Sequence, residues 1–280
     1  ALSVGTDTKG GFIVPTEFER RLVQALESQN VLRGMATVIT TSGDRNIPTV
    51  TGHGTASWIG EEGAFSESEE TLGQKVLYAY KVGTLIKTSE ELLDDSAFNL
   101  EAYLINEFAR RIGAAEETAF VNGNGIGRPK GVAQDAEIGV TAASATAVTT
   151  DELIDLFHSL KRPYRRNARW LMADATAKAI RKLKDTTNQY LWQPGLQAGE
   201  SDTLLGRPVV ISEDMPSMAT ANKSILFADF SYYWIADRQG RVFQRLNELY
   251  AANGQIGFRA YQRVDGVLTL TEAVKALKQA

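Results

Sequence analysis

A long amphipathic pattern in the middle of the chain constrains the fold more than any other feature. Its apolar residues recur every three to four positions between Asn99 and Phe120: Leu100, Leu104, Phe108, Ile112 and Ala115. Gly123 and Gly125 follow where such a helix would end, and glycine readily adopts the left-handed backbone of a helix stop. The sequence therefore predicts a long helix closed by a glycine-rich turn.

The same turn, NGNGIGRPKG, residues 122–131, has some features of a phosphate-binding loop. Such a loop follows a strand and opens a helix, so that free amides and the positive helix end meet the phosphate. Here the predicted helix comes first, and Pro129 cannot lie inside a new one. A helix stop is favoured over a nucleotide site, and no cofactor is expected.

The rest of the composition argues against the common catalytic centres. The chain has no cysteine, and its two histidines, His53 and His158, are far apart in sequence, so no metal site and no catalytic residue is predicted. Four acidic groups are expected on solvated faces: Glu61/Glu62, Glu67/Glu69/Glu70, Asp94/Asp95 and Glu116/Glu117. A basic run, KRPYRR (161–166), is typical of a helix C-terminus. We expect no enzyme activity.

Charge and hydropathy exclude two further classes of site. The net charge of −4 gives no basic surface for gripping nucleic acid, although a protein can enclose DNA without attracting it. No apolar run approaches the ~20 residues of a membrane helix, so no membrane partner is expected.

The segment Thr51–Ser89 predicts a long β-hairpin. Its first half is polar and rich in glycine yet contains Trp58, Ile59 and Phe65, and its second half alternates from Lys75 to Val82. It could be an ordinary pair of strands within a sheet. Alternatively it protrudes, and because a lone two-stranded ribbon is marginally stable in water, another molecule would then cover it.

The remaining patterns mix helices and strands and predict an α+β fold. A short helix is expected at Pro15–Ser28 after an extended arm, 1–14, and another begins with Thr150 as its cap. NARWLMAD predicts a buried strand, and DATAKAIRKLKDT a helix. Turns are expected at Ser42–Asp44, Gln239–Gly240 and Asp265–Gly266.

Three blocks in order carry a family resemblance: ETAFVNGNGIGRPKGV after the long helix, LLGRPVVISEDMP, and ILFADFSYYWIADRQGRVFQR. This series resembles the major capsid proteins of tailed bacteriophages of the Hong Kong 97 type, over roughly Thr16 to Leu270. The resemblance implies an N-terminal arm (1–30), an extended hairpin or E-loop (47–88), a peripheral domain with a long spine helix (31–46, 89–129, 228–266) and an axial domain (130–227, 267–280).

The resemblance also implies the function and the partners. Copies would form pentamers and hexamers of an icosahedral shell around packaged double-stranded DNA, within the virion and assembled in the host bacterial cytoplasm. A scaffold segment or protein, a maturation protease and a portal would act during assembly. Members commonly begin mature life after cleavage of a scaffolding segment; the opening Ala1 fits a trimmed chain, although a chosen start point would look the same.

Some members of that family join a hairpin lysine covalently to a neighbour's asparagine. This chain has no lysine between Lys9 and Lys75, and Ser66 is the nearest counterpart, so no such crosslink is expected. Apolar subunit contacts are expected from the hairpin and the arm: Trp58, Ile59, Phe65, Phe12 and Ile13. Charge pairing between subunits is expected of Glu61 and Glu62 and of Arg20 and Arg21.

Two alternatives remain open at this point. One is an encapsulin-like compartment, which shares the fold but holds cargo enzymes. The other is an ordinary α/β enzyme that uses the glycine-rich turn.

Overall fold

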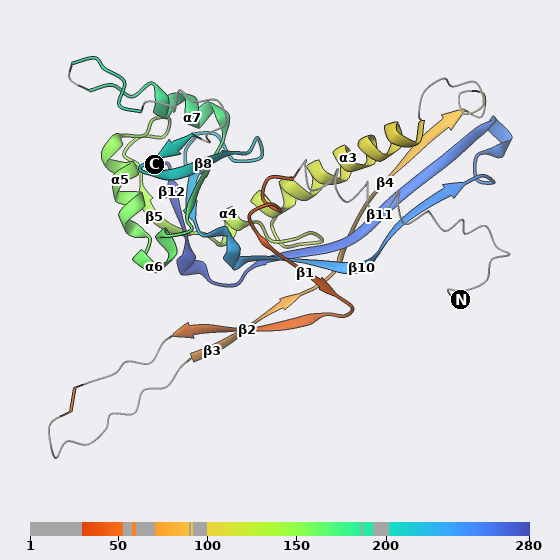
Figure 1. Ribbon diagram of the computed structural model, residues 1–280, viewed down its shortest axis with the longest axis horizontal. Coiled ribbons are helices and arrows are strands. Elements are labelled where there is room, and N and C mark those ends of the chain that lie inside the picture. The colour runs from red at the N-terminus through yellow and green to blue at the C-terminus, as the bar shows by residue number, and fades with distance from the viewer. Residues whose placement is uncertain are drawn as a thin grey trace.

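The computed structural model describes residues 30–52, 58–59, 71–89, 91, 100–185, 187–192 and 202–280. The predicted arm (1–14), the predicted helix Pro15–Ser28 and most of the expected hairpin tip lie outside these residues. The described part has three sheets, and the molecule is elongated, with a long helix at one end and a cluster of shorter helices at the other (Figure 1).

A four-stranded sheet with the long helix α3 lying along it forms one end of the molecule. Its strand order is β1-β10-β11-β4. The elements are β1 (Thr37–Thr41), β4 (Tyr80–Ser89), α3 (Leu100–Asn122), β10 (Tyr233–Leu246) and β11 (Gln255–Leu268). The helix and its glycine-rich end were predicted correctly, although Ala115 is exposed rather than part of the buried stripe.

Helix α3 packs on the sheet through the stripe that its spacing predicts. Leu104, Phe108 and Ile112 are at most 3% exposed and contact apolar residues of β11, β4 and β10. The Phe108 ring meets Phe243 edge to face, with ring centroids 5.4 Å apart. Burying one such side chain stabilises the fold by about 1.5–3 kcal/mol, so this seam holds the helix to the sheet.

Strands β10 and β11 correct two of the sequence predictions. Turns were expected at Gln239–Gly240 and at Asp265–Gly266, but both pairs lie inside continuous strands of 14 residues. Residues 239–240 fall at a register irregularity between Arg238 and Val242. Gly266 instead permits a close approach, because a Cβ there would overlap the Tyr233 hydroxyl.

A six-stranded sheet forms the other end, in the order β5-β12-β9-β6-β8-β7. Its strands are β5 (Glu137–Thr141), β6 (Arg169–Met172), β7 (Thr203–Leu204), β8 (Arg207–Ile211), β9 (Lys223–Ala228) and β12 (Val274–Lys278). The helices at this end are α5 (Thr150–Ser159), α6 (Arg162–Arg165) and α7 (Asp174–Arg181), while α4 (Val132–Asp135) contacts α3 and β11. The strand NARWLMAD and the helices near 150 and 174 were thus predicted correctly, except that Thr149, not Thr150, caps α5.

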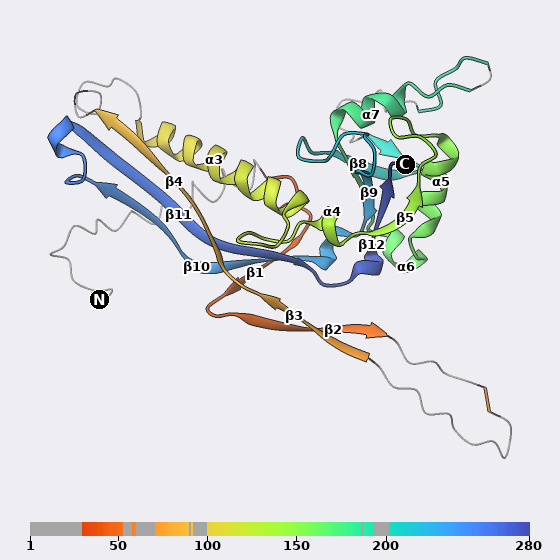
Figure 2. The ribbon, with the colours of Figure 1, turned by 180° about the vertical axis from the view of Figure 1, so that it is seen from behind.

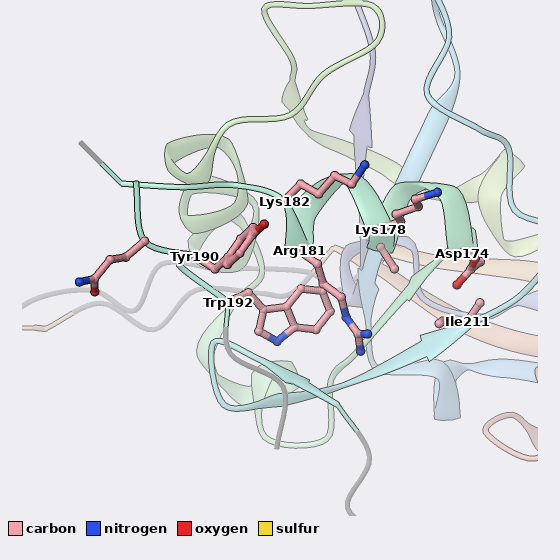
Figure 3. Close-up of a pocket in the computed structure, with 9 residues that line it drawn as sticks. Asp174, Lys178, Arg181, Lys182, Tyr190, Trp192 and Ile211 are labelled. Atoms are coloured by element: carbon pink, nitrogen blue, oxygen red, sulfur yellow. The ribbon is translucent and has the colours of Figure 1, made fainter. Parts of the chain in front are cut away.

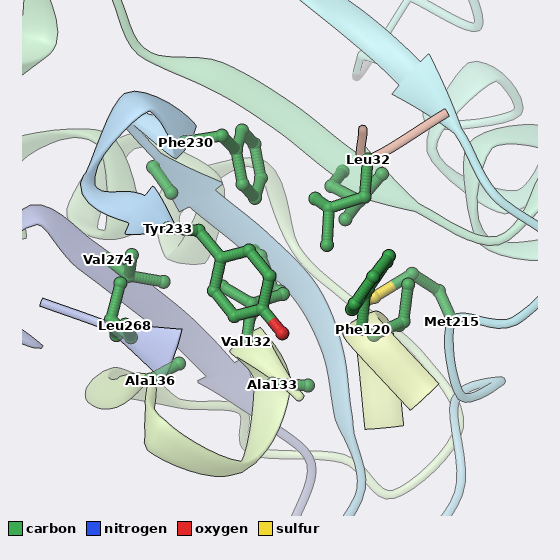
Figure 4. Packing of buried hydrophobic residues seen from close by; sticks show 14 of the residues in the cluster. Leu32, Phe120, Val132, Ala133, Ala136, Met215, Phe230, Tyr233, Leu268 and Val274 are labelled. Atoms are coloured by element: carbon green, nitrogen blue, oxygen red, sulfur yellow. The ribbon is translucent and has the colours of Figure 1, made fainter. Parts of the chain in front are cut away.

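The central strands of this sheet are buried on both faces, which explains their continuous apolar sequence. On one face Trp170 and Phe227 stack with centroids 4.3 Å apart beneath α5 and α7. On the other face Leu171 and Leu226 join a second cluster, which also contains Phe120 and Tyr233 (Figure 4). This second cluster joins the two ends of the molecule through a shared core.

The third sheet is a two-stranded antiparallel ribbon, β2 (Arg45–Gly52) with β3 (Thr71–Leu77), that leaves the body of the molecule (Figures 1 and 2). The turn at 42–44 connects it to β1, as predicted. The second half of the expected Thr51–Ser89 hairpin, which alternates from Lys75 to Val82, is divided in the structure at Tyr78–Ala79. Residues 80–89 instead pair with β11 as β4, because their apolar side chains cover α3.

Candidate assembly interface

The root of the β2–β3 hairpin is fixed to the body by a small apolar cluster. Ile47 and Leu77 are 6% and 1% exposed and pack against Ala236, with partly buried Trp234 beside them. Beyond this cluster the hairpin has no second sheet against it in the described residues. The root therefore holds the ribbon to the body, and beyond it the ribbon pairs with no other described strand.

Polar contacts fix the direction in which the hairpin leaves. The buried Asp265 carboxylate accepts a hydrogen bond from the Tyr78 amide, at the break between β3 and β4, at 2.7 Å. Burial raises the pKa of Asp265, although the amides of Tyr78 and Gly266 partly oppose that rise. Lys75 of β3 donates to the Leu268 carbonyl and lies 3.8 Å from Asp135. Burial lowers the pKa of Lys75.

An open cavity of about 650 Å³ lies beside the hairpin root. Residues of β2 form one wall, with Ile47 and Pro48, while Tyr164, Trp234 and Leu270 line other parts. Aromatic and aliphatic side chains around an open cavity favour an apolar segment over a charged one.

Two of the predicted contact residues lie in the described part of the chain. Trp58 is 105% exposed, and Ile59 is half-buried. The other predicted contacts and the Ser66 position fall outside it: Phe12, Ile13, Arg20, Arg21, Glu61, Glu62 and Phe65.

A buried ionic network lies where the chain enters the four-stranded sheet, and it was not predicted. Arg33, 6% exposed, donates to Asp237 at 2.7 Å and to Glu116 at 2.9 Å. The buried amide of Gln262 donates to the other oxygen of Glu116. Burial disfavours the charged guanidinium, but Glu116 and Asp237 outweigh it and raise the pKa of Arg33. The network ties the start of the described chain to α3, β10 and β11.

Glu117, the next residue, links this region to the six-stranded sheet. Its carboxylate accepts hydrogen bonds from the Leu32 amide and the Ser212 hydroxyl, both at 3.1 Å. Burial raises the pKa of Glu117, while these hydrogen bonds partly oppose it. The expectation that Glu116 and Glu117 lie on a solvated face was wrong: they are 2% and 5% exposed.

One signal could have identified Glu116 from the sequence. It lies four residues after Ile112 and four before Phe120, and therefore on the buried stripe of α3. A carboxylate in that register needs a buried cation, and none is close in sequence. Arg33 is 83 residues away, which is why reading neighbouring residues missed the pair.

The glycine-rich turn after α3 is engaged by the protein itself. Gly125 and Gly127 have left-handed φ angles of 76° and 68°, whereas Gly123 was expected to be left-handed and is not. A Cβ at Gly123 would instead overlap the Pro129 carbonyl oxygen, because the turn folds back over the helix end. The Gly131 amide donates to the Gly123 carbonyl at 2.9 Å. These contacts support a helix stop rather than a phosphate site.

A second open cavity, of about 770 Å³, lies on α7 (Figure 3). Its side chains combine lysines and an arginine with two aromatic rings, and a cation lies over one face of each ring. Arg181 lies 5.0 Å above the Trp192 ring, and Lys184 lies 4.9 Å above Tyr190. Trp192 is buried, so of these two rings only Tyr190 keeps an exposed surface, and the Lys184 ammonium already lies over one of its faces.

No group of three or more potential metal-ligating side chains occurs among the described residues. His158 is exposed, as expected, with an arginine against its ring. In the part of the chain that the structure covers, no helix is long and apolar enough to cross a membrane.

Comparisons with known proteins agree with this architecture. A family model described as the phage capsid family matches residues 10–279. The major capsid protein of Klebsiella oxytoca phage phiKO2 is 24% identical over 120 residues, which are 42% of this chain and 28% of that relative. The alignment thus spans less than a third of that relative.

Solved structures match over a larger part of the chain. The capsid of a native GTA particle is 29% identical, with a TM-score of 0.81, and the match covers 100% of this chain and 95% of that one. A structure from Mycobacterium phage Cain is 16% identical, with a TM-score of 0.68 and 90% of each chain covered, and shows the shared fold. On the family match over nearly its whole length, this chain belongs to the phage capsid family.

Proposed function

We propose that this chain is the repeating subunit of an icosahedral shell, assembled as pentamers and hexamers around double-stranded DNA. The observation that carries the proposal is the β2–β3 hairpin, which pairs with no other described strand, together with its fully exposed tryptophan, in a chain of the phage capsid family. A lone two-stranded ribbon gains stability when another molecule covers it. In a shell, neighbouring copies do so.

The proposed division of labour follows the two larger sheets. The part built on α3 and the four-stranded sheet serves as the peripheral domain, with the predicted bounds 31–46, 89–129 and 228–266 extended by β4 (80–89). The part built on the six-stranded sheet serves as the axial domain (130–227 and 267–280). The hairpin arm consists of the β2–β3 ribbon and the residues between its strands, since β4 belongs to the four-stranded sheet.

The role is structural, with no catalysis and no covalent crosslink between subunits. The described residues contain no metal cluster, and the glycine-rich turn uses its backbone on the protein itself. Scaffold, maturation protease and portal are the partners that a shell of this kind needs during assembly. The relatives named above are capsids, which favours a virion-like particle over a cargo compartment.

Electron microscopy and sedimentation of the purified chain test the proposal. We expect closed particles of uniform size that dissociate into single bands on a denaturing gel. A stable monomer at all concentrations, above all one that binds nucleotide, contradicts shell formation. Covalent ladders on the gel would contradict only the absence of a crosslink.

A further inference from the structure

A basic corner lies where α6 ends and strands β6 and β8 begin. We define it by Arg166, Arg169 and Arg207, which line an open cavity of about 410 Å³ together with Asp229 and Ser231. Arg166 and Arg169 are exposed, and Arg207 is half-buried. Three arginines and one acidic residue thus line the cavity, which gives its lining a net positive charge in a chain whose net charge is −4.

The charges of this corner are not neutralised within the described subunit. Asp229 is 5% exposed and caps the following turn, accepting from the Ser231 amide at 3.1 Å and from its hydroxyl at 2.6 Å. Arg207 donates to the Arg166 main-chain carbonyl at 2.8 Å, which is not a charge partner. Among the described residues, Arg166 and Arg169 have no carboxylate within ion-pair distance.

Two neighbouring basic residues, Lys161 and Arg165, have partners within the subunit, whereas the exposed Arg162 has none in the described part of the chain. Lys161 pairs with Glu272 at 2.5 Å. Arg165 donates to the Leu160 and His158 carbonyls at 2.5 and 2.9 Å. The expectation that a helix C-terminus explains the basic run 161–166 therefore holds for Arg165 but not for Arg166, whose side chain has no such contact in the described part of the chain.

The chain itself contains a segment of matching charge. Residues 61–70, EEGAFSESEE, contain five glutamates and no lysine or arginine. Their sequence position is between β2 and β3, the strands of the protruding ribbon. Five carboxylates in ten residues repel one another, and enclosed DNA would repel them further, so this acidic segment is stabilised by a cationic partner.

We infer that the basic corner of one subunit binds the acidic segment, 61–70, of a second copy. The inference rests on the proposed shell, in which every subunit supplies one acidic segment and one basic corner, so the charges match one to one. Arginine forms two parallel hydrogen bonds with a carboxylate, which fixes geometry as well as charge. Each exposed pair contributes at most about 1 kcal/mol, but a shell repeats it at every contact.

The basic corner is thus a second candidate partner for the glutamates of the acidic segment. The first is the pair Arg20 and Arg21, which the sequence analysis predicted. The contact would set the register of the hairpin on its neighbour, since complementary charge fixes orientation more than affinity. The apolar anchors of the hairpin would supply most of the binding energy.

Disulfide trapping tests the contact directly, because the native chain has no cysteine. We expect that Glu67→Cys/Arg166→Cys particles, treated with diamide, run as covalent multimers on a non-reducing denaturing gel. Glu67→Cys/Arg110→Cys is the matched control, because Arg110 is an exposed arginine on α3, and it should stay monomeric. Intact particles that yield only monomers, or only disulfides within one chain, overturn the inference while leaving the proposed shell standing.

A charge swap tests the energetics. Arg166→Glu/Arg169→Glu should lower the temperature at which particles dissociate, and Glu67→Lys/Glu69→Lys/Glu70→Lys should do the same. Combining the two sets in one chain should restore most of the loss. Arg110→Glu/Arg111→Glu, the same charge change on α3, should be rescued by no change in the acidic segment.

Two other outcomes of the swap would overturn the inference. Rescue of the acidic-segment variant by Arg20→Glu/Arg21→Glu, and not by the corner, would assign the partner to the arm. Normal heat resistance of the Arg166→Glu/Arg169→Glu particles with a loss of retained DNA would assign the corner to phosphate contact instead. If wild-type chain forms no particle under any condition, the proposed function itself fails.

Discussion

Arg33 shows how one residue can connect distant parts of the chain. Its guanidinium is 4% exposed and reaches Glu116 of α3 and Asp237 of β10. A buried ion pair contributes little net stability, because desolvation offsets most of the attraction, but losing one partner leaves a buried charge uncompensated. Arg33 therefore fixes where the chain enters the sheet, at a position just after the predicted arm.

Replacing Arg33 alone should be far worse than replacing the pair. We expect Arg33→Met to lower the free energy of unfolding by about 3–5 kcal/mol, since Glu116 then stays buried and loses the guanidinium that pairs with it. Arg33→Met/Glu116→Gln should recover a large part of that loss. Urea unfolding of dissociated subunits measures both. Equal losses in the single and the double variant would show that packing, not charge, accounts for the effect.

Glu117 gives the subunit a pH dependence whose sign follows from its burial. Its pKa is raised above the ordinary 4.5, so the folded state binds this proton more tightly than the unfolded state. The contribution of Glu117 to the free energy of unfolding should therefore increase as the pH falls from neutral, through the pKa of the folded state, toward about 4.5. Asp265, whose pKa is also raised, acts in the same direction.

Glu117→Gln should remove its part of this dependence. We expect the variant to lose less stability than wild type on going from pH 5 to pH 7. Denaturant unfolding of subunits across that range is the measurement. Glu213→Gln, at an exposed position of the nearby loop, controls for the loss of one negative charge. A Glu117→Gln curve parallel to wild type would mean that Glu117 is not the titrating group.

At the level of elements, hydrophobic periodicity predicted the buried face of a single helix. It failed for contacts with distant segments and for glycines inside strands. The α3 stripe from Leu104 to Ile112 followed from its spacing because a single face of that helix meets the sheet. Glu116 did not follow, because its cation lies in a distant segment. The Asp265–Gly266 pair was wrongly predicted to form a turn. A glycine that relieves crowding inside a strand cannot be distinguished in the sequence from one that forms a turn.

The assembly surface was less predictable than the fold. Trp58 is exposed, in keeping with an aromatic side chain in a polar, glycine-rich segment. The free charge at Arg166 and Arg169 was not predicted, because only tertiary structure shows which arginines of a basic run find partners. Alternation predicted a hairpin over Thr51–Ser89, whereas the observed strands pair over 45–52 and 71–77, and the end of the hairpin at Tyr78 depends on β4 joining β11.

Substitution of Gly266 tests whether strand β11 requires a glycine where it passes close to the Tyr233 side chain. A Cβ there would lie 2.9 Å from the ring carbon Cζ and would overlap the hydroxyl, so Gly266→Ala should cost about 1–3 kcal/mol. Tyr233→Phe removes the overlapping hydroxyl and its hydrogen bond to the Lys130 carbonyl. The double variant should therefore cost less than the sum of the two single ones, measured by urea unfolding.

Gly43→Ala is the control for Gly266→Ala, because a Cβ at Gly43 would meet nothing within 4 Å. It should change stability by no more than about 0.5 kcal/mol. Strict additivity of Gly266→Ala and Tyr233→Phe would show that the two groups do not compete for space.

For the whole molecule, the two larger sheets form one stable body, and the hairpin adds surface that this body does not use. Phe120 and Tyr233 lie in the core that joins the sheets, with ring centroids 6.1 Å apart. Trp58 lies outside any such core. Folding of the subunit and assembly of the shell should therefore depend on different residues. Substitutions of Trp58 and Trp170 can distinguish the two processes.

Trp58→Ala should leave the subunit intact and weaken the particle. Because Trp58 is 105% exposed, its removal takes away no contact within the described subunit, and the subunit's unfolding midpoint should stay unchanged. Particle yield and the temperature of particle dissociation should fall, and further in Trp58→Ala/Phe65→Ala, because hairpin anchors on neighbours are lost. Sedimentation and heating of particles, beside unfolding of dissociated subunits, measure the two effects separately.

Trp170→Ala should destabilise the subunit itself, in contrast to Trp58→Ala, which should weaken only the particle. Trp170 is fully buried and its indole donates to the Leu204 carbonyl at 2.9 Å, so the subunit itself should lose about 3–5 kcal/mol. Leu249→Ala, at a position 65% exposed on the body, controls for truncation of any exposed apolar side chain. If Trp58→Ala particles form in normal yield and resist heat as wild type does, the hairpin is not anchored through this residue. If the isolated subunit is destabilised instead, Trp58 packs within its own chain, and the shell needs another contact to hold its subunits together.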